Sequence, residues 1–181
     1  VDGVLKIFPE YVGTNLTSSI ITQMGVKPVL VHGDLWPGNI LVDCENGEVK
    51  ALIDWQTGHQ GSGVEDLIRI MFNGLSSQTR RENMKSLLEE MYTTMQTNLG
   101  SIPAPYTREE MHEMADHLFP HCGFFFLAPG KMMLKLMSSP GLNDEEKDRR
   151  KSILLDKIRG VCEDIVVYHE KNKQSIRRFK F

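Results

Sequence analysis

The stretch that decides the fold reads His32-Gly-Asp-Leu-Trp-Pro-Gly-Asn39-Ile-Leu-Val42, and the apolar segment Val49-Lys-Ala-Leu-Ile53 follows it closely. Asn46-Gly47 lies between the two, and this pair supplies the positive φ angles that tight turns require. The pattern predicts a β-hairpin with strands at 39–43 and 49–53. We expect a further strand at 28–31, immediately before His32.

Three oxygen-bearing side chains belong to this hairpin. Asp34 lies on the loop that leads into it, Asn39 begins its first strand, and Asp54 ends its second. Antiparallel pairing of the strands would place Asn39 and Asp54 close together, with Asp34 near the same corner. Such a cluster suits Mg²⁺, which takes oxygen ligands and is held by one or two carboxylates together with substrate phosphates. Asn39 and Asp54 can act as ligands while Asp34 stays free as a base.

The order of these residues is that of a kinase-type phosphotransfer site: a base Asp, a metal-binding Asn five residues later, then a metal-binding Asp. The stretch from His32 to Leu41, followed by Ile53-Asp-Trp-Gln56, resembles the CHK kinase-like (ecdysteroid-kinase-like) family. More broadly it is similar to choline kinases and aminoglycoside phosphotransferases. The resemblance is anchored in residues 28–69. It implies an α+β fold, a protein-kinase-like C-terminal lobe that is mainly helical with a small β-hairpin.

The resemblance also implies roles for individual residues. Asp34 would be the catalytic base facing an acceptor hydroxyl, and Asn39 and Asp54 would bind Mg²⁺ bridging the phosphates of ATP. His32 would brace the catalytic loop, and Asp66 would order that loop through hydrogen bonds to backbone amides. The implied activity is ATP- and magnesium-dependent transfer of the γ-phosphate to a hydroxyl of a small molecule.

Kinases of this type also need a Gly-rich loop, a strand Lys and a helix Glu, and none of these can be placed in the 31 residues before His32. The chain begins with Val1, so we expect residues 1–181 to be the C-terminal lobe of a longer protein, without its nucleotide-covering lobe. Whether the lobe alone catalyses phosphoryl transfer stays open. The alternative is a truncated or pseudokinase-like binding module without turnover.

A third hypothesis is a metallophosphoesterase-like hydrolase that uses His32, Asp34, Asp54 and His59. Two-metal sites need more ligands than these, so this reading is disfavoured. His112, His117 and His121 do not make a zinc site by spacing, because no Glu completes the pattern H-E-x-x-H.

The second half of the chain is predicted to be mostly helical. A helix is expected at 65–75, capping boxes begin at Thr79 and Thr107, and Asn143 caps a long C-terminal helix. Pro120 and Pro129 are expected to break the middle into short pieces. The methionines are expected in the core. Residues 124–126, all Phe, are expected either in the core or in the wall of an acceptor pocket.

Composition limits the remaining possibilities. The net charge is −3, which does not favour nucleic-acid binding. The longest apolar run is too short for a membrane span, and the three cysteines do not form a disulfide framework, so a cytoplasmic protein is expected. Met, Phe and Leu in the helical half hint at an apolar alcohol, such as a steroid, as the acceptor. The oligomeric state is not readable from the sequence.

Overall fold

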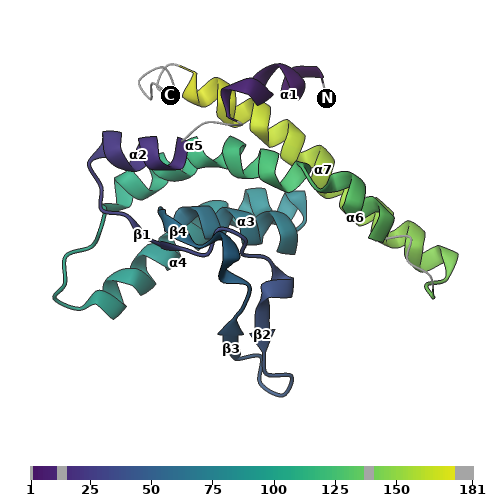
Figure 1. Ribbon diagram of the computed structural model, residues 1–181, viewed down its shortest axis with the longest axis horizontal. Helices are drawn as coiled ribbons and strands as arrows, with labels where there is room; N and C mark the ends of the chain where they lie inside the picture. The colour runs from purple at the N-terminus through teal and green to yellow at the C-terminus, as the bar shows by residue number, and fades with distance from the viewer. Residues whose placement is uncertain (1, 12–15, 137–140, 174–181) are drawn as a thin grey trace.

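The computed structural model describes residues 2–11, 16–136 and 141–173, which form a mainly helical α+β lobe, as predicted (Figure 1). The α-helices are α1 (Asp2–Ile7), α2 (Leu16–Met24), α3 (Val64–Gly74), α4 (Ser77–Leu99), α5 (Arg108–Leu127), α6 (Gly130–Leu136) and α7 (Asp144–Asn172). The strands are β1 (Val29–Val31), β2 (Ile40–Val42), β3 (Val49–Leu52) and β4 (His59–Gly61). Three short 3₁₀ helices are η1 (Phe8–Glu10), η2 (Pro37–Asn39) and η3 (Trp55–Thr57).

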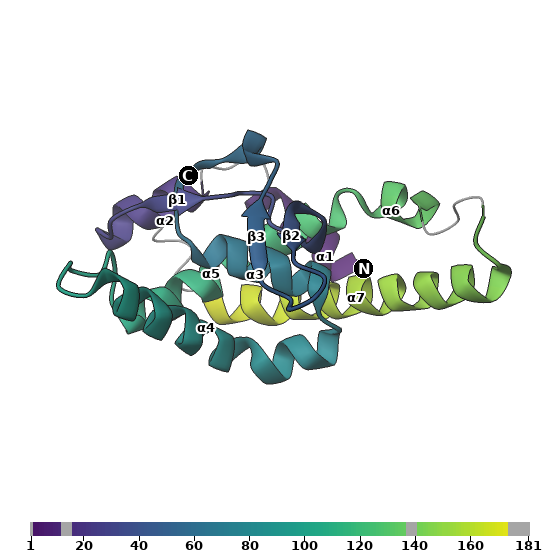
Figure 2. The same cartoon turned by 90° about the horizontal axis from the view of Figure 1, so that it is seen from below.

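Helix α5 is the centre of the helical body, because α2, α3, α4 and α7 all pack against it. Most of the buried core lies at these contacts. Of the five methionines expected in the core, Met84, Met111 and Met114 are buried, and Met91 and Met95 are partly buried and pack against it. In Figure 2, α4 lies alongside α7. Gly160 permits this approach, since a Cβ at that position would lie 2.0 Å from Oγ of Ser77. No helix in the described ranges is long and apolar enough to cross a bilayer.

The helix starts follow local hydrogen bonding. The capping box at Thr107 and the Asn143 cap are both confirmed. The capping box predicted at Thr79 is wrong, because Ser76 is the N-cap of α4 and its side chain accepts a hydrogen bond from the backbone N–H of Thr79. The hydroxyl of Ser76 or that of Thr79 could accept a hydrogen bond from a free N–H at the start of the helix, and the structure uses Ser76.

Pro120 does not break a helix, contrary to the sequence prediction, but lies inside α5. A proline has no N–H, so the carbonyl of Asp116, four residues earlier, loses its usual partner. The side-chain amide of Asn172 in α7 donates to that carbonyl at 2.6 Å. A contact between distant parts of the chain therefore offsets the missing hydrogen bond within the helix.

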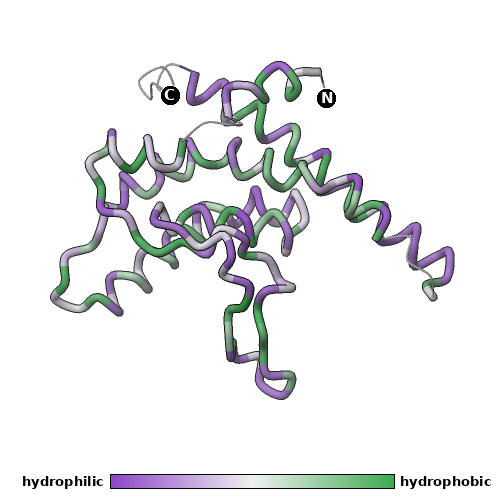
Figure 3. Tube along the Cα trace, viewed as in Figure 1, coloured by the Kyte–Doolittle hydropathy of each residue, from purple (hydrophilic) through white to green (hydrophobic). Residues whose placement is uncertain are grey.

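The predicted hairpin is present as β2 and β3, and it projects from the helical body in Figure 1. Of the turn residues, only Gly47 has a positive φ, so Asn46 does not contribute the second positive φ expected of it. Figure 3 shows hydrophobic residues along both strands of the hairpin, and several of their side chains are exposed. The predicted strand before His32 is β1, but it pairs with β4 and not with the hairpin.

Candidate functional site

Asp34 and Asn39 are joined directly. Asp34 follows β1 on the loop to η2, and Asn39 is the last residue of η2. The Nδ2 group of Asn39 donates to the backbone oxygen of Asp34 at 2.9 Å and lies 3.5 Å from the Asp34 carboxylate. Asn39 is only 5% exposed, so its side chain is held in place. The amide nitrogen is used internally, and the amide oxygen is the end left to bind a ligand.

Asp54 reaches the same corner through the hairpin register. The backbone N–H of Ile53 donates to the backbone oxygen of Asn39 at 3.0 Å, so Asp54 lies one residue beyond the paired position. Its φ of 65° and ψ of 58° make Asp54 the one non-glycine residue with positive φ among those described. Left-handed backbone in a non-glycine residue is strained, and such strain is concentrated at functional sites.

His32 ties the loop to the end of β3. Its Nδ1 accepts a hydrogen bond from the backbone N–H of Asp34 at 3.3 Å, so the proton of the neutral ring is on Nε2. Nε2 donates to the backbone oxygen of Ile53 at 2.8 Å. The ring is 2% exposed and lies against Trp55, with 4.6 Å between the ring centroids. One buried imidazole thus connects the residues beside Asp34 and Asp54.

Asp66 holds the other side of the loop. Its two carboxylate oxygens accept hydrogen bonds from the backbone N–H groups of His32, at 2.7 Å, and Gly33, at 2.9 Å. Asp66 lies in the first turn of α3, where a negative charge is favourable. Gly33 has a φ of 79°, and a Cβ on it would lie 2.5 Å from the backbone oxygen of Thr57. Only glycine fits this crossing, which brings the loop against η3.

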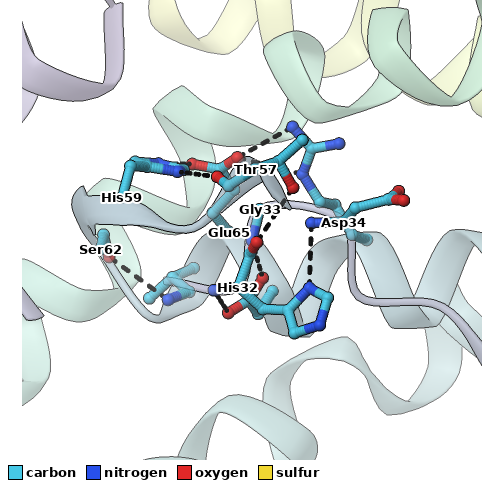
Figure 4. A network of polar contacts seen from close by, with 10 residues as sticks. His32, Gly33, Asp34, Thr57, His59, Ser62 and Glu65 are labelled. Atoms are coloured by element: carbon cyan, nitrogen blue, oxygen red, sulfur yellow. Dashed lines mark hydrogen bonds and ion pairs between the residues drawn. The ribbon is translucent and has the colours of Figure 1, made fainter. Parts of the chain in front are cut away.

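A second polar layer, which sequence reasoning missed, lies behind the loop (Figure 4). Glu65 is 2% exposed, and its Oε1 accepts hydrogen bonds from Nε and Nη2 of Arg69 at 3.0 and 2.8 Å. Its Oε2 lies 3.3 Å from Nε2 of His59, while Nδ1 of His59 contacts the backbone oxygen of Thr57 at 3.0 Å. This cluster links β4 and η3 to α3. The i,i+4 spacing of Glu65 and Arg69 is the signal that could have found it.

An apolar cavity of about 420 Å³ opens beside Asp34. Its walls come from the loop at Asp34–Trp36, from α3, from the end of α5 and from α6. Phe125 lines it, Phe126 lines it and also belongs to the buried core, and Phe124 is buried in the core alone. Trp36 lines this cavity too.

The donor set fits a magnesium ion shared with phosphates. Within the described ranges, no three His, Cys, Asp or Glu side chains form a metal-binding cluster. The set at the hairpin corner is smaller, with one amide oxygen from Asn39 and one carboxylate from Asp54. Mg²⁺ is typically bound by one or two protein carboxylates, with substrate phosphates and water completing its shell. The fixed orientation of the Asn39 amide and the strained backbone of Asp54 are consistent with such a role.

Of the three α5 histidines, His117 and His121 are buried, whereas His112 is half-buried, with its Nε2 2.6 Å from Oε1 of Glu89. His121 is hydrogen-bonded through Nδ1 to the backbone oxygen of Tyr11 at 3.0 Å. Burial lowers the pKa of His121 and that of His117, so both favour the neutral form. The cysteines are all free, and burial raises the pKa of the Cys122 thiol, which keeps it uncharged.

The architecture is thus a mainly helical lobe with an Asp–Asn–Asp set carried on a short hairpin. The chain belongs to the DUF1679 family, described as "Uncharacterized oxidoreductase dhs-27", whose family model matches residues 1–173. It is also similar to the "Uncharacterized kinase-like protein D1044.1" of Caenorhabditis elegans, with 35% identity over 91 residues. That alignment covers 50% of this chain and 24% of the relative, so the chain spans about a quarter of the relative it matches. No solved structure is significantly similar to it.

Proposed function

We propose that this lobe carries the metal-binding and acceptor-binding half of a small-molecule kinase of the CHK kinase-like type. The proposal is supported chiefly by the hydrogen bond from Asn39 to Asp34 and by the backbone pairing of Asn39 with Ile53, the residue before Asp54. The printed name of the Caenorhabditis elegans relative, "kinase-like", supports the same class.

Each residue of the corner has a role in this proposal. The amide oxygen of Asn39 and the carboxylate of Asp54 hold Mg²⁺, which when bound would neutralise charge on the phosphates of ATP. Asp34 accepts the proton of the acceptor hydroxyl on its carboxylate, and such a base contributes about 10²- to 10⁴-fold to the rate. His32 and Asp66 hold the loop in place before substrate arrives, which favours phosphoryl transfer because positioning accounts for much of its catalysis.

The acceptor is proposed to be a small, mostly apolar alcohol. The cavity beside Asp34 is lined mainly by Phe, Met, Leu, Trp and Pro side chains, with Asp34 as its carboxylate. A hydroxyl placed at Asp34 would leave the rest of the molecule against apolar surface, where burial stabilises binding. The cavity volume of about 420 Å³ suits a small molecule and not a folded protein substrate.

The family description names an oxidoreductase, and the fold argues for the kinase-like class instead. Nicotinamide dinucleotides are typically bound at the carboxyl edge of a parallel sheet. The strands in the described ranges form two antiparallel pairs, β1 with β4 and β2 with β3.

The alternative function with the same fold is a pseudokinase-like binding module, which would bind nucleotide or acceptor but would not transfer phosphate.

Manganese is a paramagnetic substitute for magnesium, and its binding in the presence of a non-hydrolysable ATP analogue tests the metal assignment. We expect electron paramagnetic resonance to show nucleotide-dependent binding that Asp54→Asn weakens by about 10-fold or more, because a ligand charge is lost. Asparagine tolerates the left-handed backbone at this position. Asp148→Asn, at an exposed carboxylate on α7, is the matched control and should bind normally. Equal binding by both variants would remove Asp54 from the site.

A further inference from the structure

We propose that Arg69 determines acceptor specificity by donating hydrogen bonds to a second, uncharged oxygen of the acceptor, at a distance from the hydroxyl held by Asp34. The acceptor would then be an apolar alcohol that also carries a carbonyl or a further hydroxyl group. Only the placement of the acceptor hydroxyl at Asp34 rests on the proposed function. The binding of the second acceptor oxygen by Arg69 rests on the contacts of Arg69 itself.

The guanidinium of Arg69 is fixed with hydrogen-bonding capacity to spare. Its Nε and one Nη2 hydrogen are used by Oε1 of Glu65, and its Cζ lies over the Phe125 ring, 4.7 Å from the ring centroid. A guanidinium has five N–H groups, so three remain. Among the described residues, none accepts a hydrogen bond from these three. Arg69 lines the same cavity as Asp34, with a side chain that is 14% exposed.

The anchoring of Arg69 makes it a rigid recognition element. Its partner Glu65 is held in turn near His59, and Asn73 donates from Nδ2 to the backbone oxygen of Arg69 at 2.9 Å. Because the guanidinium is bonded twice to Glu65 and lies over Phe125, the side chain has little rotamer freedom left to lose when a ligand binds, and preorganised donors bind with a smaller entropic penalty. An acceptor oxygen would meet a donor fork that is already in position.

The charges around Arg69 favour a neutral oxygen over a carboxylate. Glu65 already pairs with the guanidinium, and Asp66 also acts on Arg69 electrostatically. Asp34 adds a further carboxylate to the cavity wall. Glu65 and Asp66 thus act on Arg69 while Asp34 lines the same cavity, and an anionic acceptor would meet these negative charges, whereas a carbonyl or hydroxyl oxygen would carry no charge for them to repel.

Three flexible probes of equal chain length test this assignment: octanol, the corresponding ω-hydroxy methyl ketone, and ω-hydroxyoctanoate. The chain has two tryptophans, and Trp36 lines the cavity, so its fluorescence reports binding. Loss of the fluorescence change in the Trp36→Phe variant would assign that change to Trp36. We expect the hydroxy ketone to bind about 10-fold more tightly than octanol, because a hydrogen bond to a charged donor is among the stronger ones. We expect ω-hydroxyoctanoate to bind no better than octanol.

Arg69→Met should abolish the preference for the hydroxy ketone while octanol still binds. Because that change leaves the buried Glu65 without its cation, the double variant Glu65→Gln with Arg69→Met removes both charges and keeps the test usable if the single variant does not fold. Arg149→Met, at an exposed arginine of α7, is the matched control. Equal binding of all three probes, tightest binding of the carboxylate, or no binding would overturn the inference.

Phosphoryl transfer from MgATP to the same probes, measured with the longest natural polypeptide that contains this chain, separates the two proposals. If the probes bind in the expected order and none is phosphorylated, the Arg69 assignment stands and the kinase proposal fails. If octanol and the hydroxy ketone are phosphorylated equally well and Arg69→Met changes neither rate, the kinase proposal stands and the Arg69 assignment is overturned.

Discussion

The side-chain amide of Asn39 donates a hydrogen bond to the backbone oxygen of Asp34, with 2.9 Å between nitrogen and oxygen. This bond couples a candidate base to a candidate metal ligand and fixes which end of the Asn39 amide faces outward. Both residues are therefore positioned by one contact, which explains why the amide is needed at a site where a carboxylate would also bind metal.

The isosteric variant Asn39→Asp tests this bond. An aspartate cannot donate to the Asp34 oxygen, and its charge would lie near the Asp34 carboxylate, so we expect a loss of about 1–3 kcal/mol in the free energy of unfolding. Urea denaturation measures it. Asn46→Asp in the hairpin turn is the control, since Asn46 only accepts a hydrogen bond there, from the N–H of Glu48, and should change little. An Asn39→Asp protein as stable as the wild type would contradict the assigned orientation.

Asp66→Asn should loosen the loop that joins β1 to η2. Its carboxylate accepts two backbone N–H groups, from His32 and Gly33, and an amide can accept only one of them without presenting its own N–H to the other. We expect a loss of about 1–3 kcal/mol in the free energy of unfolding, measured by chemical denaturation. Asp148→Asn is the comparison, because Asp148 is an exposed carboxylate on α7 that accepts no backbone N–H from the described residues, and the expected change is within about 0.5 kcal/mol. Similar losses in both variants would mean that Asp66 has no special structural role.

Asp54→Gly should stabilise the fold while removing the proposed metal ligand. The left-handed backbone at Asp54, with a φ of 65°, is strained for aspartate and comfortable for glycine. We expect a gain of up to about 1 kcal/mol in the free energy of unfolding, together with weaker manganese binding. Thermal denaturation and metal titration on the same sample would show whether stability and binding change in opposite directions. A loss of stability would show that the aspartate side chain supports the backbone here.

The stability of the lobe should fall on mild acidification. The pKa of His121 lies below its ordinary value of 6.5 because burial disfavours the imidazolium. The unfolded chain therefore binds a proton more readily than the native one as the pH falls through about 6.5, and the free energy of unfolding falls with it until the lower native pKa is passed. His121→Gln should reduce this dependence, measured by denaturation at several pH values. An unchanged slope would show that His121 is not responsible.

Local signals were enough to predict much of the architecture. The hairpin was predicted from the apolar segments on either side of Asn46-Gly47. The caps at Thr107 and Asn143 were predicted because each side chain can accept a hydrogen bond from the backbone N–H three residues later. Strand β4, with the sequence His59-Gln-Gly61, has no such signal, since it is a strand only because β1 pairs with it. The α5 helix passes Pro120 because Asn172 supplies a distant partner, which no local rule contains.

The candidate site divides in the same way. From the order of Asp34, Asn39 and Asp54 in the sequence, we predicted that these residues lie near one end of the hairpin. The backbone pairing of Asn39 with Ile53, the residue before Asp54, agrees with that strand register. Helices α1 and α2 were not predicted from the sequence. Arg69 was missed because an arginine four residues after a glutamate is usually a surface pair on a helix. Its importance comes from the cavity, which forms only when α3, α5 and α6 meet.

The most direct measurement of the central claim is the rate of phosphoryl transfer from MgATP to a hydroxylated apolar acceptor. It should be made with this chain and with the longest natural polypeptide that contains it, as the wild type and as Asp34→Asn. The account predicts turnover by the wild-type site and a fall of about 10²- to 10⁴-fold in Asp34→Asn, with manganese–nucleotide binding retained. Transfer at the wild-type rate by Asp34→Asn, or no transfer by either wild-type protein when nucleotide and acceptor both bind, would contradict it.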